Sequence, residues 1–383
     1  MGKSVDEIPV AYDLAGLSTG VEADAGQADL LIIEPFDPAK IDVITRTPTV
    51  DLLLARLRRG VLDLQPEFQR LAGVWNDEKQ SKLIESLLLR IPLPTMYAAE
   101  DGEGWVVVDG VQRMSTIARF VDPELVGMTP LKLRGLEYLP FNGAGYSDLP
   151  GPLQTRIDET ELLVHLIRAG TPEAVKYNIF ARLNTGGSPL TRQELRHALV
   201  PGTARELLKR LADSEEFIAA TGGSVRPTRM DDREMVLRFL AFRLTDPADY
   251  PRGDLDEFLR EAMQRLNTLP EDRLAELTGE FAKAMDAAAE IFGKHAFRKV
   301  FRGSNYRAPV NKALFESESV ALAGFRPWEL DQLRDRSGEV LERLTDMIEE
   351  APFFQAISAG TGDVEKVKLR FREVERMLRQ AAA

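Results

Sequence analysis

The sequence contains no cysteine and very little histidine. Without cysteine the chain cannot form disulfides, thiolate nucleophiles, zinc ribbons or cysteine-bound iron–sulfur clusters. Its three histidines, His165, His197 and His295, lie too far apart in the sequence for a short His-x-x-His motif. The common metal and nuclease motifs that depend on these two residue types are therefore excluded.

Long hydrophobic runs are also missing. No apolar run approaches the ~18 residues that a membrane-spanning helix needs. The opening residues, MGKSVDEIPVAYD, carry neither an apolar stretch nor the basic flank of a secretion signal. The Gly-Lys-Ser at residues 2–4 has no room before it for the first glycine of a Walker A loop. We therefore expect a cytoplasmic protein with no membrane segment.

The charge is unevenly distributed along the 383 residues. The net charge is −12, and residues 1–40 alone carry eight acidic side chains against two lysines. We interpret residues 1–40 as an acidic, flexible arm. The length favours two domains at roughly 150 residues each, and the 44% of hydrophobic residues is enough for a sizeable core. Hydrophobic periodicity predicts an α+β protein, with a mixed domain over 41–200 and an all-helical domain over 201–383.

The expected elements follow from capping residues, breakers and periodicity. In the mixed region we predict strands over 95–99 and 105–108, joined as a hairpin, and over 131–133 and 161–167. Helices are predicted over 49–59, 76–91, 112–121, 151–157 and 172–182, and again from Thr191, which forms a capping box with Glu194. In the helical region we predict helices over 203–212, 231–245, 254–267, 271–292, 310–320, 327–349 and 363–381.

The segment VVVDGVQR, residues 106–113, is the best candidate for chemistry. Gly110 between a strand and a helix allows a ligand to approach the backbone, and the first amides of the helix offer hydrogen-bond donors. Arg113 adds a positive charge suited to phosphate, and Asp109 can hold a metal ion or orient a water molecule. The alternative is a structural turn in which Asp109 caps the helix and Arg113 is solvated.

Two further polar clusters are weaker on their own. In QPEFQR, Gln69 and Arg70 can hydrogen-bond a base, a sugar or a phosphate, with Phe68 or Trp75 as an apolar wall. In FARLNTGGSPLTRQELR, Asn184 and the two following glycines fit a turn between two helices. Buried aromatic residues in a surface loop explain the first cluster equally well, and a plain helix–helix turn explains the second.

A basic stretch follows the long helix expected over 271–292. Between residues 293 and 315 there are six basic side chains and no acidic one, interleaved with aromatic residues. This combination is typical of contacts to nucleic-acid phosphates and bases. The alternative is that the stretch docks on an acidic neighbour or on residues 1–40 of the same chain. The candidate DNA contacts are Lys294, Arg298, Lys299, Arg302 and Arg307.

Taken together, these pieces resemble the GmrSD-type restriction endonuclease N-terminal domain, family 262 of the domains of unknown function. The resemblance rests on PEFQR with the following VW, NDEKQSKLIESLLLRIPLP, VVDGVQRMSTIARF, LPGPLQTRI and FARLNTGGSPLTRQELRHAL, all in the same order. It runs from about residue 50 to residue 200, with weaker similarity in RMDDREMVLRFLAF and VNKALF. Each motif is weak alone, and the order of the five carries the assignment.

The resemblance implies a ParB/sulfiredoxin-like domain that binds and hydrolyses a nucleotide in a prokaryotic system of restriction or anti-phage defence. Asp109, Gly110, Gln112 and Arg113 match the family's nucleotide motif, with Asp109, Gln112 and Arg113 in the catalytic roles and Asp109 on Mg²⁺. Gln69 and Arg70 match the family's Y-Q-R, and Asn184 matches its R-L-N-x-G-G turn. The resemblance implies that these three residues also contact the NTP. DNA, including modified DNA, is the implied target.

The sequence departs from the family pattern in ways that limit its activity. Val111 replaces the first glutamine of the nucleotide motif, and Phe68 replaces a tyrosine, so hydrolysis is in question. The scattered histidines cannot form the C-terminal His-Asn-His nuclease half of many members, so cleavage would fall to a partner nuclease. Two alternatives stay open, a DNA-binding module without turnover and a stand-alone ParB-like nuclease. The sequence leaves the oligomeric state open.

Overall fold

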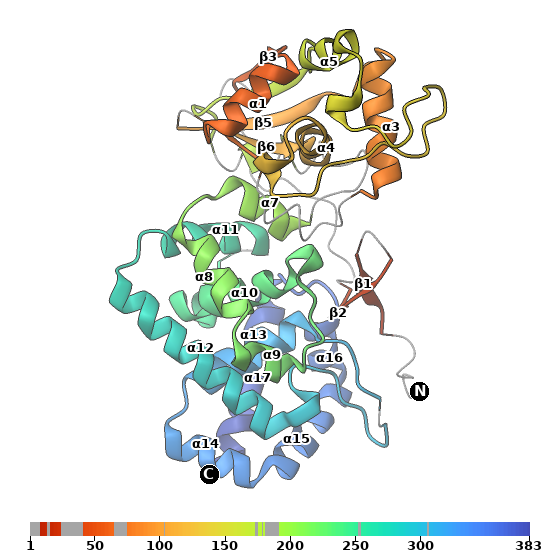
Figure 1. Cartoon of the computed structure of the whole chain (residues 1–383). Helices are drawn as coiled ribbons and strands as arrows, with labels where there is room; N and C mark the ends of the chain where they lie inside the picture. The colour runs from red at the N-terminus through yellow and green to blue at the C-terminus, as the bar shows by residue number, and fades with distance from the viewer. Residues whose placement is uncertain are drawn as a thin grey trace. The chain divides into compact units, whose positions relative to one another are not determined.

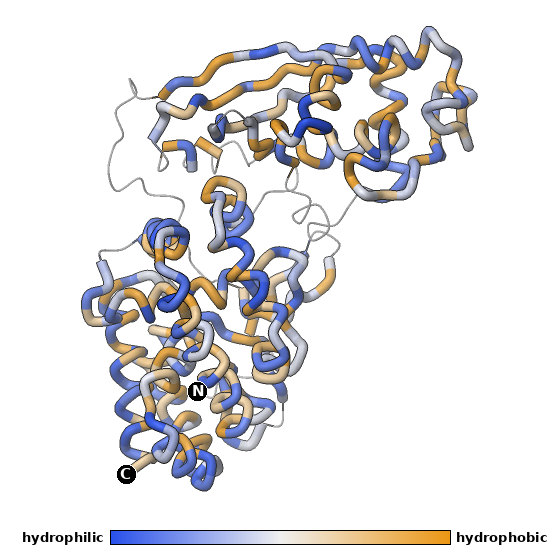
Figure 2. The backbone as a smooth tube through the Cα atoms, turned by 60° about the vertical axis from the view of Figure 1, so that its left-hand side comes forward, coloured by the Kyte–Doolittle hydropathy of each residue, from blue (hydrophilic) through white to orange (hydrophobic). Residues whose placement is uncertain are grey.

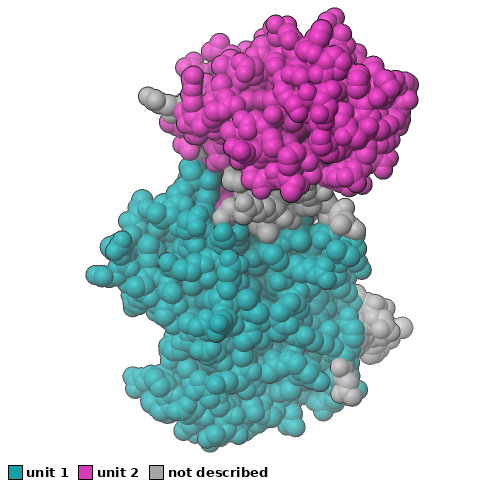
Figure 3. All heavy atoms as spheres, viewed as in Figure 1, with its two compact units in different colours: residues 1–33, 200–383 teal, residues 34–199 magenta. Residues whose placement is uncertain are grey.

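The protein consists of two compact units. A computed structural model describes residues 8–13, 16–23, 41–64, 75–102, 104–172, 175–177, 179–180, 191–251, 254–304 and 306–383. Unit 1 comprises residues 1–33 and 200–383, and unit 2 comprises residues 34–199 (Figure 3). The chain therefore begins in unit 1, forms unit 2 and then returns to unit 1. The expected mixed region followed by a helical region is confirmed.

Unit 2 is built on a mixed sheet (Figure 1) of five strands, in the order β3-β7-β5-β6-β4. The predicted hairpin is confirmed, since β5 pairs antiparallel with β6, while β5 and β7 run parallel. The two edge strands, β3 and β4, were not predicted, because four and two residues are too few for a readable alternation. The strands are β3 (Val43–Arg46), β4 (Leu62–Asp63), β5 (Met96–Asp101), β6 (Gly104–Asp109) and β7 (Val164–Ile167).

The helices of unit 2 begin where capping residues predict. The Thr49 hydroxyl accepts a hydrogen bond from the amide of Leu52, and the Asn76 side chain accepts one from the amide of Lys79. The helices are α1 (Val50–Arg58), α3 (Asp77–Leu88), α4 (Val111–Val121), α5 (Gly151–Asp158) and α7 (Arg192–Leu199), with short 3₁₀ turns at Pro123–Val126 and Tyr146–Asp148. Residues 175–177 and 179–180, inside the helix predicted over 172–182, are also helical.

One face of the sheet is covered by α7 and by the helical residues that precede it. Val108 of β6 and Ile167 of β7 are buried in a cluster with Phe180 and Leu195. Because side chains alternate along a strand, the neighbouring Val107, which is also buried, lies on the opposite face. Burial on both faces explains why β6 is an unbroken apolar run that ends at Asp109.

The strand predicted over 131–133 is wrong. Leu131 and Leu133 are buried, each only 1% exposed, so the apolar pattern is real. The backbone of Leu133, however, bonds to Ala144 and Gly143 of the following loop, and this segment pairs with none of the described strands. Alternating burial therefore reflects a loop packed on the core, which the period of two cannot distinguish from a strand.

The described residues of unit 1 are helical apart from one N-terminal hairpin and the connecting loops. Hydrophobic and hydrophilic residues alternate along its helices (Figure 2), and the hydrophobic ones form one large buried core. Helices α9 and α16 were not predicted, and the single helix predicted over 327–349 is two, interrupted at Arg336. The helices are α8 (Thr203–Ala212), α9 (Glu215–Thr221), α10 (Asp231–Leu244), α11 (Leu255–Leu266), α12 (Glu271–Phe292), α13 (Lys312–Ala323), α14 (Pro327–Asp335), α15 (Ser337–Glu349), α16 (Ala351–Ser358) and α17 (Val364–Ala381), with 3₁₀ turns at Pro227–Arg229, Pro247–Asp249 and Gly293–His295.

Part of the segment expected to be a flexible acidic arm is an ordered hairpin of unit 1. Strands β1 (Val10–Tyr12) and β2 (Ser18–Glu22) pair antiparallel, and Val21 is fully buried in the helical core. Gly20 has φ +78°, and a Cβ there would lie 1.8 Å from the carbonyl oxygen of Ser224, so only glycine allows this approach. The expected flexible arm is wrong for these residues. The hairpin buries apolar surface, and its backbone forms hydrogen bonds with the later part of unit 1. Residues 24–40 of the expected arm lie outside the described part.

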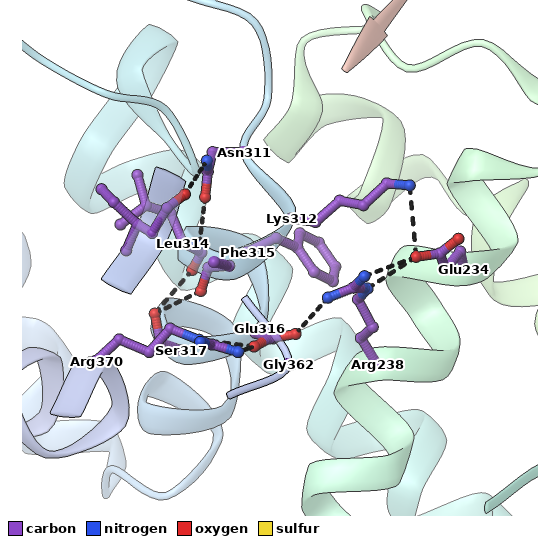
Figure 4. A network of polar contacts seen from close by, with 12 residues as sticks. Glu234, Arg238, Asn311, Lys312, Leu314, Phe315, Glu316, Ser317, Gly362 and Arg370 are labelled. Atoms are coloured by element: carbon purple, nitrogen blue, oxygen red, sulfur yellow. Dashed lines mark hydrogen bonds and ion pairs between the residues drawn. The ribbon is translucent and has the colours of Figure 1, made fainter. Parts of the chain in front are cut away.

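A buried network of ion pairs crosses the core of unit 1 (Figure 4). Arg238 of α10 bonds both to Glu234, one turn earlier, and to Glu316 of α13, at 2.8 and 3.0 Å. Arg370 of α17 bonds to the other oxygen of Glu316, and Lys312 lies 3.4 Å from Glu234. The network thus ties α10, α13 and α17 together through groups that are almost completely buried.

Candidate functional site

The turn between β6 and α4 has the geometry of a ligand-binding turn. Gly110 has φ +98° and is the N-cap of α4. A Cβ at this position would lie 2.6 Å from Cγ of Met96, so both the backbone conformation and the close approach require glycine. Among the described residues no side chain caps the helix, so the first amides of α4 remain donors for an anion.

Arg113, expected to bind phosphate, is instead directed at its own chain. The side chain is only 11% exposed, and one terminal nitrogen lies 2.8 Å from a carboxylate oxygen of Asp109. The guanidinium also donates to the carbonyl oxygens of Pro94 and Thr95, just before β5. Arg113 therefore fixes the start of α4 to the start of β5. A direct contact between Arg113 and a phosphate would require some of these bonds to break.

Asp109 is the accessible group of the turn. Its side chain is 50% exposed, and it lies at the end of β6 beside the first turn of α4. The ion pair with Arg113 sets its orientation and balances its charge. Neither of the two alternatives drawn from the sequence fits fully: Asp109 does not cap α4, and Arg113 is not solvated. The turn can present a carboxylate and uncapped amides to a ligand.

Gln112 connects the turn to the segment that precedes α3. Its side-chain oxygen accepts a hydrogen bond of 3.4 Å from the amide of Trp75, and Gln80 donates to the carbonyl of Trp75 at 2.6 Å. The ammonium of Lys79 lies 4.5 Å from the centre of the Trp75 ring. Trp75, which the sequence suggested as an apolar wall, is thus held next to the β6–α4 turn.

Behind the turn, Arg119 of α4 joins three elements. It is 8% exposed and donates to Asp77 and Gln80 of α3 and to the carbonyl of Thr129. The hydrogen bond from Arg119 is the main reason that the pKa of Asp77 is lowered from its usual value. Because Asp77 belongs to α3 and Arg119 to α4, this charge pair also connects the two helices.

The other predicted nucleotide contacts lie outside the described residues. Gln69 and Arg70 fall in 65–74, and Asn184 falls in 181–190. The flanks of both segments are described. Residue 63 of β4 pairs with Val106 of β6 on one side of 65–74, and on the other side Trp75 bonds to Gln112. The predicted capping box after 181–190 is confirmed, with reciprocal hydrogen bonds between Thr191 and Glu194 at the start of α7.

Two basic side chains of the stretch after α12 are bonded to other groups of unit 1. One of these contacts agrees with the alternative that the stretch docks on residues 1–40. Lys299 is 3% exposed, and its ammonium lies 2.6 Å from Glu22 of the N-terminal hairpin. Arg298, 2% exposed, donates to Thr221 and Ser224. The expectation that Lys299 and Arg298 contact DNA is therefore wrong, because their charged groups are buried against protein partners.

The three remaining candidate DNA contacts of that stretch lie at the surface. Lys294 is exposed, Arg302 forms ion pairs with Asp346 and Glu349 of α15, and Arg307 donates to the carbonyl of Thr221. Only these three could still reach a nucleic acid. The stretch as a whole is therefore not the continuous basic surface that its sequence suggests.

The described ranges contain no group of three or more His, Asp or Glu side chains positioned to hold a metal ion. Asp109 is a single carboxylate beside a guanidinium, so these residues do not form a metal site by themselves. Over the same ranges, no helix is both long and apolar enough to span a membrane.

The architecture of unit 2 defines a mixed α/β domain with a glycine turn between a buried strand and a helix. Residues 51–201 match the family model described as "GmrSD restriction endonuclease, N-terminal domain". This segment of the chain therefore belongs to that domain family, and the resemblance found from its motifs is confirmed. No curated protein and no solved structure matches the chain.

Proposed function

We propose that this protein is a nucleotide-binding regulatory component of a DNA restriction or defence system, with DNA cleavage carried out by a partner. The family of residues 51–201 connects the chain to restriction. The single observation that carries the nucleotide proposal is the β6–α4 turn, where Gly110 opens the backbone and the start of α4 has no side-chain cap. Within this proposal, unit 2 has a ParB/sulfiredoxin-like fold.

In this proposal the residues of the turn have different roles. The amides of α4 hold a phosphate, Asp109 orients a water molecule or a donor group of the nucleotide, and Gln112 positions the chain around Trp75. Arg113 positions Asp109 rather than binding phosphate, because its guanidinium is already bonded to Asp109 and two carbonyls. Gln69, Arg70 and Asn184 are the proposed contacts from the segments that the structure does not describe.

Mg²⁺ enters the proposal only together with the nucleotide. A lone carboxylate is a poor site for Mg²⁺, which is commonly held by one or two carboxylates and by substrate phosphates. We therefore assign no step to a metal. Arg113 is already bonded to protein groups, and Asp109 is the single carboxylate of the turn. Both facts favour a second candidate, a nucleotide- or DNA-binding module without turnover. The stand-alone nuclease has no support from the described residues, because they contain no metal-binding cluster.

The experiment compares two aspartates in matched surroundings. Asp109 is 50% exposed and 2.8 Å from Arg113, and Asp148 is 51% exposed and 2.8 Å from Lys132. We expect Asp109→Asn to weaken binding of fluorescent ATP or GTP analogues and to abolish any phosphate release, while Asp148→Asn leaves both unchanged. Absence of nucleotide binding by the wild-type protein refutes the proposal. Binding without phosphate release selects the second candidate.

A further inference from the structure

A cleft in unit 1 is lined by an unusual number of basic side chains. It has a volume of about 910 Å³ and lies between the last turns of α10 and α13 and one side of α17. Five of its lining side chains are basic and two are acidic, in a chain whose net charge is −12. The basic residues are Arg243, Lys368, Arg372, Arg376 and Arg379.

Four of these residues form a row along α17. Lys368, Arg372, Arg376 and Arg379 are spaced by four, four and three residues, so they lie on one face of the helix. Four helical residues rise ~6 Å, so the row extends over about three turns. The adjacent face of α17, which includes Phe371 and Val374, is buried in the core and holds this row in position beside the cleft.

The two basic residues in the middle of the row are accessible. The side chains of Arg372 and Arg376 are 68% and 63% exposed, and both pair with Glu373. The carboxylate of Glu373 is 17% exposed, but both arginines extend into solvent. Pairs screened by solvent in this way contribute little to stability, so a phosphate can replace the carboxylate at low cost. At the two ends of the cleft, Arg243 is tied to Glu280 and Arg379 to Glu329.

The row is not needed to neutralise the helix ends that meet at the cleft. Carbonyl groups at the C-terminal end of a helix carry partial negative charge and attract cations. At the end of α13, Lys283 donates to the carbonyls of Ala323 and Phe325. At the end of α10, Arg265 donates to the carbonyl of Leu244. Other cations therefore already satisfy these carbonyl groups, and the basic row is not required for them.

We propose that this cleft and the row Lys368–Arg372–Arg376–Arg379 bind the sugar–phosphate backbone of DNA without reading its sequence. Guanidinium groups match phosphate with two parallel hydrogen bonds, and regularly spaced basic residues on one helix can follow a strand of phosphates. This inference rests on the proposed function only in taking DNA as the partner. It moves the DNA contact from the stretch 293–315 to α17.

The test uses the full-length protein and a short fluorescein-labelled DNA duplex of arbitrary sequence. The variant R372E/R376E reverses the two exposed charges of the row. The control variant K294E/R302E makes the same change of charge at the surface positions of the stretch after α12. Fluorescence anisotropy gives the affinity at several salt concentrations between about 50 and 200 mM, and thermal unfolding shows that each variant is folded.

We expect R372E/R376E to weaken DNA binding on the order of tenfold or more. The negative slope of log affinity against log salt should become less steep by about 1.8, or ~0.9 for each lost phosphate contact. The neutral variant R372Q/R376Q should show a smaller loss in the same direction, and K294E/R302E should bind nearly as the wild type does. Nucleotide binding measured on the same variants should be unchanged.

Three results would overturn the inference. Equal losses in R372E/R376E and K294E/R302E would show that only total charge matters. A loss confined to K294E/R302E would return the DNA contact to the stretch after α12. Binding of a fluorescein-labelled polyglutamate peptide at least as tightly as the duplex would identify an acidic protein as the partner. A failure of nucleotide binding in the wild type would refute the proposed function but leave this DNA result readable.

Discussion

The buried ion network of unit 1 allows a quantitative prediction through the substitution Glu316→Gln. The side chains of Glu316 and Arg370 are fully buried, and Arg238 is 1% exposed. Arg238 keeps Glu234 as a second carboxylate partner after the substitution. Arg370 keeps a 3.4 Å hydrogen bond to the carbonyl of Ala356, but its charge loses its carboxylate partner in the core.

Removing one partner of a buried ion pair costs 3–5 kcal/mol, because the other charge stays desolvated. Glutamine retains one acceptor oxygen, so we expect the lower end, ~3 kcal/mol. With a urea m-value of about 2 kcal/mol per molar, the midpoint of unfolding should fall by ~1.5 M. Circular dichroism of the helices follows unit 1, in which most of the helices lie.

The control is Glu339→Gln, which removes the exposed pair with Arg343 one turn away on α15. Such a surface pair is worth ~0.5 kcal/mol, and the midpoint should barely move. The double variant E316Q/R370M should recover much of the loss, because it removes the uncompensated charge. If Glu316→Gln shifts the midpoint no more than Glu339→Gln does, the network contributes no more than a surface pair and the reasoning is refuted.

Three further predictions concern single groups. Burial raises the pKa of Glu318 to about 8. Its contribution to stability is therefore complete below its usual pKa and is lost as the pH rises towards 8. Urea unfolding measured at several pH values should show this loss in the wild type and not in Glu318→Gln. Gly110→Ala should lower the stability of unit 2 by about 1–3 kcal/mol in thermal unfolding, and wild-type stability would contradict the strain argued from φ and Met96. Burial opposes ionisation of Glu85, but hydrogen bonds from the amides of residues 137–139 lower its pKa. Glu85→Ala should therefore lower the free energy of unfolding by ~2 kcal/mol and speed hydrogen exchange of those amides. Unchanged exchange would contradict this.

Local features of this protein could be predicted from the sequence because they depend on residues close together in the chain. The capping box of Thr191 and Glu194, the β5–β6 hairpin and the turn at Gly110 all formed where the residue types indicated. The order of the motifs also identified the family of residues 51–201. Such signals are local, so no tertiary information is needed to detect them.

The basic row on α17 could have been found in the sequence and was missed. Counting charges in a continuous window selects residues 293–315, where basic residues are adjacent in the chain. In a helix, residues four apart are neighbours in space, so Arg372 and Arg376 form one surface despite the acidic residues between them. A search at helical spacing would have detected the row, although the cleft beside it depends on α10 and α13.

The sequence by itself determined most of the helices, the β5–β6 hairpin, the family of residues 51–201 and the identity of the turn at Asp109. Only the tertiary structure decided which charges are available. Lys299 is neutralised by Glu22, 277 residues earlier, and Arg370 by Glu316, while Arg113 is bound to backbone carbonyls. The same side chain is a ligand-binding group in water and a structural one when buried, because a buried charge must find its partner inside the protein.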